Sequence, residues 1–289
     1  MRTTQETNAL AKRLVISALA IFLTSTSIGA HAGQAWDRIE KNKEMVVATD
    51  VANPPASFLA EGNNLDGFDV AVAREIAKRI GVNVRFVTPS WDVITAGNWQ
   101  GRWDLSVGSM TPTAQRRRVL DFPAIYYYAP GGIAVHVKNT TIKSASDARG
   151  EKVGTQAGST YEQYLLGTLN IDSDGQVPFV FQVKDPVMTT YEGEATALDD
   201  LRLGDGVRLD AVVVSQQAIL GAIKSGYPIR QVGGPLFYEP LGVAIEKGDP
   251  EFVGHIQQAV DSMKKDGVLK QLSEKWFHAD YSSTIRSDS

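Results

Sequence analysis

The segment from Trp103 to Thr113 reads WDLSVGSMTPT, and a run of three arginines begins shortly afterwards at Arg116. The apolar and small residues from Leu105 to Gly108 predict a short buried strand. The residues from Thr111 to Arg118 predict a loop or the start of a helix. Hydroxyl groups and a guanidinium group are therefore expected just beyond the end of a strand.

Strands and helices alternate on both sides of this segment, and this alternation favours α/β layers. A helix is expected between Gly67 and Gly81, a short one from Trp91, and others after Gly158 and near Ser215. Two amphipathic helices are expected at the end of the chain. The expected strands are Met45 to Thr49, Val82 to Val87, Leu105 to Gly108, Ile133 to Val137, Lys152 to Thr155, Asp210 to Val214 and Leu241 to Ile245.

Two strands of similar composition, Ile133 to Val137 and Leu241 to Ile245, flank the middle of the chain. This arrangement predicts a second lobe inserted into the first. Lobe one would comprise residues 33–137 and 241–289, and lobe two residues 138–240. The chain would then cross between the lobes twice.

The first 32 residues have the three parts of a secretory signal peptide. Arg2, Lys12 and Arg13 give a positive start, Leu14 to Leu23 is apolar, and a small-residue stretch ends at Ala32. The alternative is a membrane anchor, but the apolar run is well short of the roughly 20 residues that span a bilayer. We therefore expect an exported, periplasmic protein that is cleaved after Ala32.

The composition excludes several classes of protein. The formal net charge of −4 argues against a nucleic-acid-binding protein, and the absence of cysteine excludes disulfides and thiolate chemistry. The sequence has neither metal-ligand spacing nor a glycine-rich phosphate loop, so no metal or cofactor is expected.

Short motifs follow one another in a fixed order along the chain. They are Gly67-Phe68-Asp69, Trp91-Asp92, Trp103 to Thr113, Arg116, Val119 to Phe122, Val153 to Thr160, Arg208 to Val212, Glu239 to Ala244, Lys247 to Pro250 and Glu274 to Phe277. Their order and spacing resemble the bacterial family-3 solute-binding proteins, the polar amino-acid receptors of ABC importers.

The resemblance implies an α/β fold of the type II periplasmic-binding-protein kind, with two lobes joined by two crossing hinge strands. It implies a small-molecule ligand, an amino acid or a derivative, held in the cleft between the lobes. It also implies an ABC transporter permease in the inner membrane as the partner of a monomeric receptor. The expected mechanism is a hinge closure over the ligand that the transporter reads.

In the family, an arginine at the position of Arg116 holds the α-carboxylate of the ligand. A guanidinium group suits this role because it offers two parallel hydrogen bonds to a carboxylate. Ser109 and Thr111 match hydroxyl positions beside it, and Gly108 would let the backbone approach the ligand. The competing interpretations are a solvated arginine run and ordinary loop capping.

Lobe two is expected to contribute Ser159 and Thr160, at the start of a helix whose free N–H groups favour an anion. Their alternative role is capping of that helix. Gln156 occupies a position where some relatives have a polar ligand contact. Trp91 matches an aromatic wall of the cleft, or is part of the core, and Asn53 stands where relatives usually have an aromatic residue.

The main departure from the family is Ser215, which stands where amino-acid receptors have an aspartate for the α-ammonium of the ligand. Because an unpaired buried ammonium is costly, another acid must neutralise it or the ligand must lack it. Asp50 is the preferred candidate, and Glu192 and Glu194 are weaker ones. A ligand with a modified or absent amine, such as an opine or a compatible solute, is the alternative.

Enzymes with this fold include dehydratases of cyclohexadienyl compounds, which need a positioned general acid. Among the cleft positions that the sequence identifies, only Asp50 offers one, and we therefore expect a binding protein and no enzyme. A ligand-sensing ectodomain is the other alternative.

Overall fold

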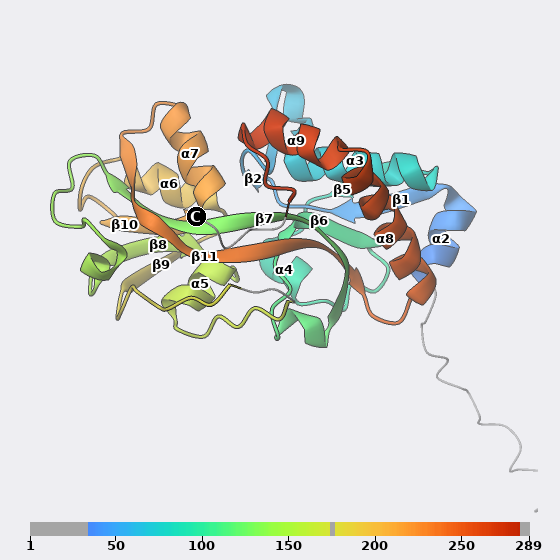
Figure 1. Ribbon diagram of the computed structural model, residues 1–289, viewed down its shortest axis with the longest axis horizontal. Helices are drawn as coiled ribbons and strands as arrows, with labels where there is room; N and C mark the ends of the chain where they lie inside the picture. The colour runs from blue at the N-terminus through green and yellow to red at the C-terminus, as the bar shows by residue number, and fades with distance from the viewer. Residues whose placement is uncertain (1–33, 174–176, 284–289) are drawn as a thin grey trace, which may run out of the picture. The chain divides into compact units, whose positions relative to one another are not determined.

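A mixed sheet of eight strands runs through the described part of the chain, residues 34–173 and 177–283 of the computed structural model (Figure 1). Its strand order is β5-β1-β6-β11-β7-β10-β8-β9. The strands at each end pair in parallel, whereas β11 pairs antiparallel with both β6 and β7. A second, three-stranded sheet has the order β2-β3-β4.

The helices and strands alternate as the sequence predicts. The helices are α2 (Gln34–Asn42), α3 (Phe68–Ile80), α4 (Trp91–Thr95), α5 (Thr160–Leu165), α6 (Glu194–Leu201), α7 (Gln216–Lys224), α8 (Pro250–Lys265) and α9 (Val268–Phe277), with 3-10 turns at Glu61–Asn63, Arg116–Arg118 and Ala145–Ala148. The strands are β1 (Glu44–Ala48), β2 (Ala52–Asn53), β3 (Ser57–Leu59), β4 (Leu65–Asp66), β5 (Asn83–Val87), β6 (Leu105–Met110), β7 (Leu120–His136), β8 (Lys152–Gln156), β9 (Val187–Tyr191), β10 (Ala211–Ser215) and β11 (Ile229–Glu246).

The strands β6 and β10, inside the sheet, are almost entirely buried because both faces of the sheet are covered. Successive side chains of a strand point to opposite faces. Val47 and Ala48 of β1 accordingly belong to two different core clusters, and so do Val212 and Val213 of β10. The result is an α/β arrangement with helices on both faces of the sheet.

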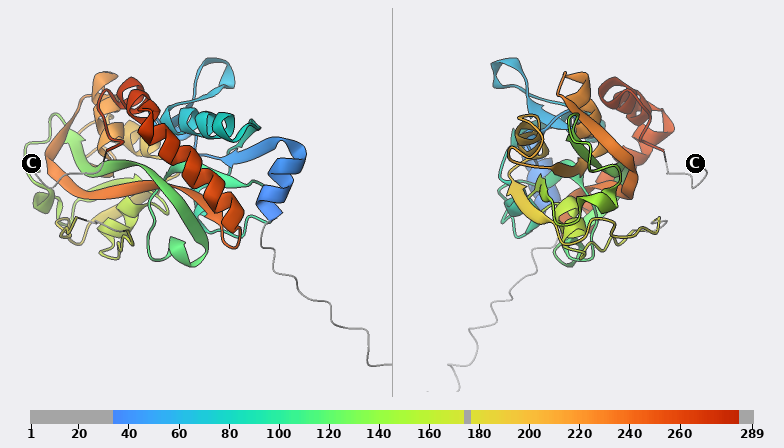
Figure 2. Two further views of the ribbon diagram at one scale, coloured as in Figure 1. Left: turned by 45° about the vertical axis from the view of Figure 1, so that its right-hand side comes forward. Right: turned by 90° about the vertical axis from the view of Figure 1, so that its left-hand side faces the viewer.

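Different helices cover different parts of this sheet. Residues of α3, α8 and α9 form one core cluster with β1 and β6, and residues of α6 and α7 form another with β10. Figure 2 shows the long helix α8 lying against the strands. Apolar side chains at helical spacing, such as Phe252, Ile256 and Val260 of α8, supply the buried face.

The two long strands, β7 and β11, are the main difference from the sequence-based expectation. The sequence predicts short strands at residues 133–137 and 241–245, whereas these strands contain 17 and 18 residues. They pair from Leu120 and Glu246 at one end to His136 and Ile229 at the other, and register shifts interrupt the pairing. Prolines, glycines and these irregularities hide the length of both strands in the sequence. The division into lobes at residues 137/138 and 240/241 remains a prediction.

The expected signal peptide and its cleavage site, residues 1–32, lie outside the described residues. Within residues 34–173 and 177–283, no helix is both long enough and apolar enough to cross a membrane.

Candidate ligand-binding site

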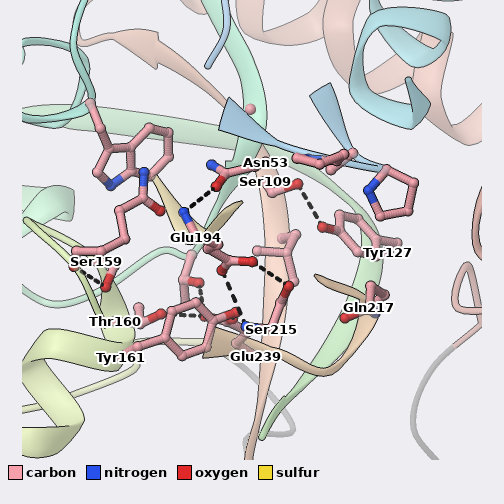
Figure 3. Close-up of a pocket in the computed structure, with 18 of the residues that line it drawn as sticks. Asn53, Ser109, Tyr127, Ser159, Thr160, Tyr161, Glu194, Ser215, Gln217 and Glu239 are labelled. Carbon is pink, nitrogen blue, oxygen red and sulfur yellow. Dashed lines mark hydrogen bonds between the residues drawn. The ribbon is translucent and has the colours of Figure 1, made fainter. Parts of the chain in front are cut away.

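One cavity is lined by most of the expected site residues, which come from both halves of the sheet (Figure 3). Its walls surround roughly 530 Å³ of space, a volume that includes open solvent at the mouth. Of the expected residues, Asp50 and the weaker candidate acid Glu192 do not line it. The lining residues are Asn53, Pro54, Pro55, Ala56, Trp91, Gly108, Ser109, Thr111, Arg116, Tyr127, Gln156, Ser159, Thr160, Tyr161, Glu194, Ser215, Gln217, Glu239, Leu241 and Phe277.

Arg116 is a buried cation in the wall of the cavity, 4% exposed. Its Nη1 donates to the carbonyl oxygen of Thr111 at 3.0 Å, and its Nη2 to that of Gly158 at 3.0 Å. The guanidinium carbon lies 5.4 Å from the ring centre of Trp91, a cation–π distance. Burial lowers the pKa of Arg116 to about 10, so the group stays charged at neutral pH. Two of its five N–H groups are used, and a carboxylate could accept from the others.

Glu239 is an acidic wall residue that the sequence analysis did not single out. The carboxylate, on β11, accepts hydrogen bonds from the hydroxyls of Thr111, of Thr160 at 2.7 Å and of Tyr161 at 2.5 Å. Burial raises the pKa of Glu239, whereas its hydroxyl donors and the charge of Arg116 oppose that shift. Two hydroxyls expected to face a ligand carboxylate, those of Thr111 and Thr160, therefore bind a carboxylate of the protein itself.

Ser159 has the capping role that was its alternative interpretation. Its Oγ accepts from the backbone N–H of Glu162 at 3.1 Å and donates to the carbonyl oxygen of Gln156 at 2.6 Å. The helix that it caps, α5, is only six residues long.

At the other wall, a Cβ added to Gly108 would lie 3.5 Å from the Trp91 ring, so a small residue lets this ring approach the strand.

Ser109 is held in the cavity wall by a buried network. Its Oγ donates to Asp69 Oδ2 at 2.7 Å and accepts from the hydroxyl of Tyr127 at 2.6 Å, and its N–H donates to the hydroxyl of Tyr126 at 2.8 Å. The backbone of Ser109 has a φ of 55°, a conformation that non-glycine residues rarely adopt. Burial raises the pKa of Asp69 to about 7.

Ser215 hydrogen-bonds to a carboxylate, that of Glu194. It caps helix α7 by accepting from the N–H of Ala218 at 3.2 Å, and its own Oγ donates to Glu194 Oε2 at 2.6 Å. The N–H of Ser215 donates to the other carboxylate oxygen of Glu194 at 3.2 Å. A carboxylate from α6 thus lies beside the position where the family's aspartate would stand, and burial raises the pKa of Glu194 to about 7.

A close contact between α6 and the three-stranded sheet positions Glu194. Gly193 precedes the helix, and a Cβ added to it would lie only 2.3 Å from the Cβ of Ala52 on β2. The Glu194 N–H donates to the side-chain oxygen of Asn53 at 3.0 Å. The sequence pattern did not predict α6 or β2, which is why Glu194 ranked low among the candidate acids.

Asp50, the preferred candidate acid, lies behind the cavity wall. Its carboxylate accepts from the backbone N–H groups of Val51 and Ala52 at 2.6 and 2.9 Å, and from the side-chain amides of Asn53 and Gln156, both at 2.8 Å. These four donors leave it little capacity for a ligand. Asn53 and Gln156 line the cavity in front of it, and both are expected site residues.

The side chains of Tyr127, Tyr161, Gln217, Leu241 and Phe277 complete the walls. The sequence offered little signal for them, because they come from β7, α5, α7, β11 and α9 and meet only in the folded chain. Within the described ranges, no group of three or more His, Cys, Asp or Glu residues could hold a metal ion.

A family model described as the bacterial extracellular solute-binding proteins, family 3, matches residues 45–279. The chain belongs to this family. It is 30% identical over 277 residues to the L-cystine-binding protein TcyJ of Escherichia coli strain K12, an alignment that covers 94% of this chain and 97% of that protein.

Solved structures support the same assignment. An ancestral arginine-binding protein bound to arginine is 33% identical, with a TM-score of 0.70 over 81% of this chain and 98% of that one. The ancestral amino acid-binding protein AncCDT-1, a precursor of cyclohexadienyl dehydratase, is also 33% identical, with a TM-score of 0.72 over 83% and 98%. This family 3 protein therefore has the α/β periplasmic-binding-protein fold.

Proposed function

We propose that this family 3 protein captures an α-amino acid with a free ammonium group for an ABC importer. The observation that carries the proposal is the presence of Arg116 and of the Glu194–Ser215 pair in one cavity. A zwitterion needs one site of each charge, and this cavity offers both. Relatives named for binding cystine and arginine support an amino acid as the ligand.

Arg116 is the site for the α-carboxylate. The guanidinium is buried and aligned by two carbonyl oxygens, so it meets the ligand without having to be ordered first. Trp91 stacks on the same group and keeps water from it. A charge-assisted pair in such a place is stronger than one at the surface.

Glu194 is the site for the α-ammonium. Its carboxylate accepts only from Ser215 among the described residues, and two further lone-pair directions suit an ammonium. Asp50, by contrast, is saturated by donors of the protein. Although serine replaces the family's aspartate at position 215, the ligand can have an amine. Ser215 hydrogen-bonds to Glu194 of the neighbouring helix α6, and Glu194 supplies the negative charge.

Capture is completed by closure of lobe two, residues 138–240, over lobe one, residues 33–137 and 241–289. Four hydrogen bonds link the proposed lobes beside the cavity: Arg116 to Gly158, Gln156 to Asp50, Glu194 to Asn53, and Thr111 to Glu239. Ligand favours closure only by binding the closed form better. The permease would read that form on a monomeric, periplasmic receptor that is cleaved after Ala32.

A thermal-shift screen tests this function. L-α-amino acids, including L-cystine and L-arginine, are compared with analogues that lack the amine or carry a quaternary one. A ligand that binds only the folded state must raise the melting temperature. We expect at least one free amino acid to stabilise the protein and its deaminated analogue to have little effect. Stabilisation by opines or betaines alone would contradict the proposal.

A second candidate function is dehydration of a cyclohexadienyl acid. One observation favours it: Glu194, a buried acid with its pKa raised to about 7, could donate a proton at neutral pH. The similarity to AncCDT-1 is compatible with either function. Incubation of the purified protein with a cyclohexadienyl carboxylic acid, followed by ultraviolet detection of an aromatic product, separates them. We expect no turnover.

A further inference from the structure

The side-chain amide of Gln217 is buried in the cavity wall without a partner. Gln217 is 6% exposed, and neither its Oε1 nor its Nε2 has a hydrogen-bonding partner among the described residues. Leaving a buried polar group unpaired destabilises the folded protein. Proteins rarely retain such a cost without a reason, so each such group calls for an explanation.

The neighbouring glutamine, Gln216, differs from Gln217 in this respect. Gln216 precedes it on α7, and its Nε2 donates to Gln231 Oε1 at 3.1 Å. Gln216 does not line the cavity, whereas Gln217 does. Of these two adjacent glutamines, the one outside the cavity is therefore bonded to the protein, and the one in the cavity wall is not.

Gln217 and Ser159 lie on opposite sides of the cavity, and Gly158, next to Ser159, accepts a hydrogen bond from Arg116. In the view of Figure 3, Gln217 and Tyr127 lie on one side of Glu194, and Ser159 and Thr160 lie on the other. The rings of Tyr127 and Phe277 stack at 5.5 Å between centres and form an apolar wall there. The side chain of a ligand held by Arg116 and Glu194 would extend into this side of the cavity to reach Gln217.

We propose that Gln217 forms a distal subsite that selects a side-chain end without net charge, presenting a hydrogen-bond donor beside an acceptor. This inference rests on the proposed amino-acid function. A primary amide is both donor and acceptor, so it matches a carboxamide or a second, zwitterionic amino-acid head. It offers no charge to a lone carboxylate or ammonium.

Unpaired amide atoms discriminate against the wrong ligand as well as favouring the right one. An aliphatic side chain would occupy the same space and leave both amide atoms buried and unpaired. Sites built to hydrogen-bond a ligand reject analogues that lack the group more strongly than apolar pockets reject a missing methylene. The subsite therefore acts mainly by excluding aliphatic amino acids.

Calorimetric titrations with matched ligands test this subsite. L-glutamine and L-cystine carry the proposed group, L-norleucine replaces it with an aliphatic end, L-glutamate replaces it with a charge, and L-alanine lacks it. For the wild-type protein we expect glutamine or cystine to bind at least about tenfold more tightly than norleucine. Binding of glutamine alone would indicate a carboxamide site, and binding of cystine alone a site for a second head.

Gln217→Met removes the amide at nearly constant volume, and Gln216→Met is the matched control outside the cavity. Gln217→Met should reduce the preference over norleucine to about threefold or less, with norleucine binding unchanged or tighter. If the variant does not fold, Gln217→Glu replaces it and should shift preference from glutamine toward L-lysine.

An undiminished preference in Gln217→Met, or a wild-type protein that prefers norleucine, would overturn the subsite. The proposed function would survive that result, because norleucine and alanine still report on the carboxylate and ammonium sites. Failure of every amino acid to bind the wild-type protein would instead overturn the proposed function together with the subsite.

Discussion

Two buried glutamates face the same cavity in different surroundings. Glu239 accepts from three hydroxyls and lies near the charge of Arg116. Among the residues that the structure describes, Glu194 accepts only from Ser215, through one hydroxyl and one N–H group. The protein has therefore completed the hydrogen bonding of Glu239 and left that of Glu194 open. A carboxylate whose acceptor positions are filled by the protein stabilises the structure around it, whereas one with free acceptor positions is suited to bind a ligand.

The same contrast extends to the neutral groups of the cavity. The hydroxyls of Thr111 and Thr160 are bound to Glu239, whereas the amide of Gln217 has no partner among the described residues. Residue type alone would have ranked the threonines as better ligand contacts than Gln217. The hydrogen-bonding state of a group in the folded protein is a better guide to ligand contacts than its residue type.

The largest effect on binding is expected from Arg116→Ala. Truncating one partner of a buried charged pair costs about 2–5 kcal/mol, or roughly thirtyfold to several thousandfold in affinity. Arg117→Ala is the control, because Arg117 contacts Asp172 at the surface, with its Nε donating to the backbone oxygen at 2.7 Å. Calorimetry with the best amino-acid ligand checks both. Equal losses in the two variants would show that the carboxylate site is misplaced.

Gly193→Ala should disturb Glu194 without changing its chemistry. The added Cβ would lie 2.3 Å from the Cβ of Ala52, so α6 must move away from β2. We expect a loss of about 1–3 kcal/mol in the free energy of unfolding and about tenfold in affinity. Gly254→Ala is the control, since a Cβ there meets nothing within 4 Å in helix α8. It should be neutral or stabilising in chemical denaturation, and binding that survives intact in Gly193→Ala would argue against a role for Glu194.

Binding of an ammonium ligand should weaken as the pH falls through neutrality. Burial, with smaller contributions from the charges of Glu239 and Asp50, raises the pKa of Glu194 to about 7 in the free protein. The ammonium needs the ionised form, so protonation below this pH competes with binding. Calorimetry should show a loss of about tenfold between pH 8 and pH 6. The profile of Glu194→Gln should be flat over this range, and an equally steep profile in that variant would assign the effect to another group.

The smallest expected effects are on stability. For stability, Glu239 is expected to matter more than Glu194, whereas for ligand binding Glu194 is expected to matter more. Glu239→Gln replaces one accepting oxygen by a donor, so the free energy of unfolding should fall by about 1 kcal/mol. Glu194 has a pKa raised to about 7, so its ionisation destabilises the folded state as the pH rises toward 7. Glu194→Gln removes that penalty. Thermal unfolding at pH 8 should therefore show an unchanged or higher melting temperature for Glu194→Gln and a lower one for Glu239→Gln.

The sequence was most informative where a local pattern carries the structure. The apolar run of β10 and the spacing in α3 predicted both elements to within a residue or two, and the arginine after β6 was expected in the cleft and lines it. The position of α6 was not predictable, because it depends on the contact of Gly193 with Ala52, 141 residues earlier by chain position. Asp50 was therefore preferred over Glu194, although four donors of the protein occupy its carboxylate.

The role of Glu194 as the counter-charge of the ligand's ammonium is the central claim, and one measurement tests it directly. Wild-type protein and Glu194→Gln are titrated with the best amino-acid ligand and with the same compound lacking its α-amine. We predict that Glu194→Gln loses at least about tenfold in affinity for the amino acid, because a charged partner has been removed from a buried pair. Affinity for the deaminated compound should be unchanged or higher. Equal losses for both compounds, or no loss for the amino acid, would contradict it.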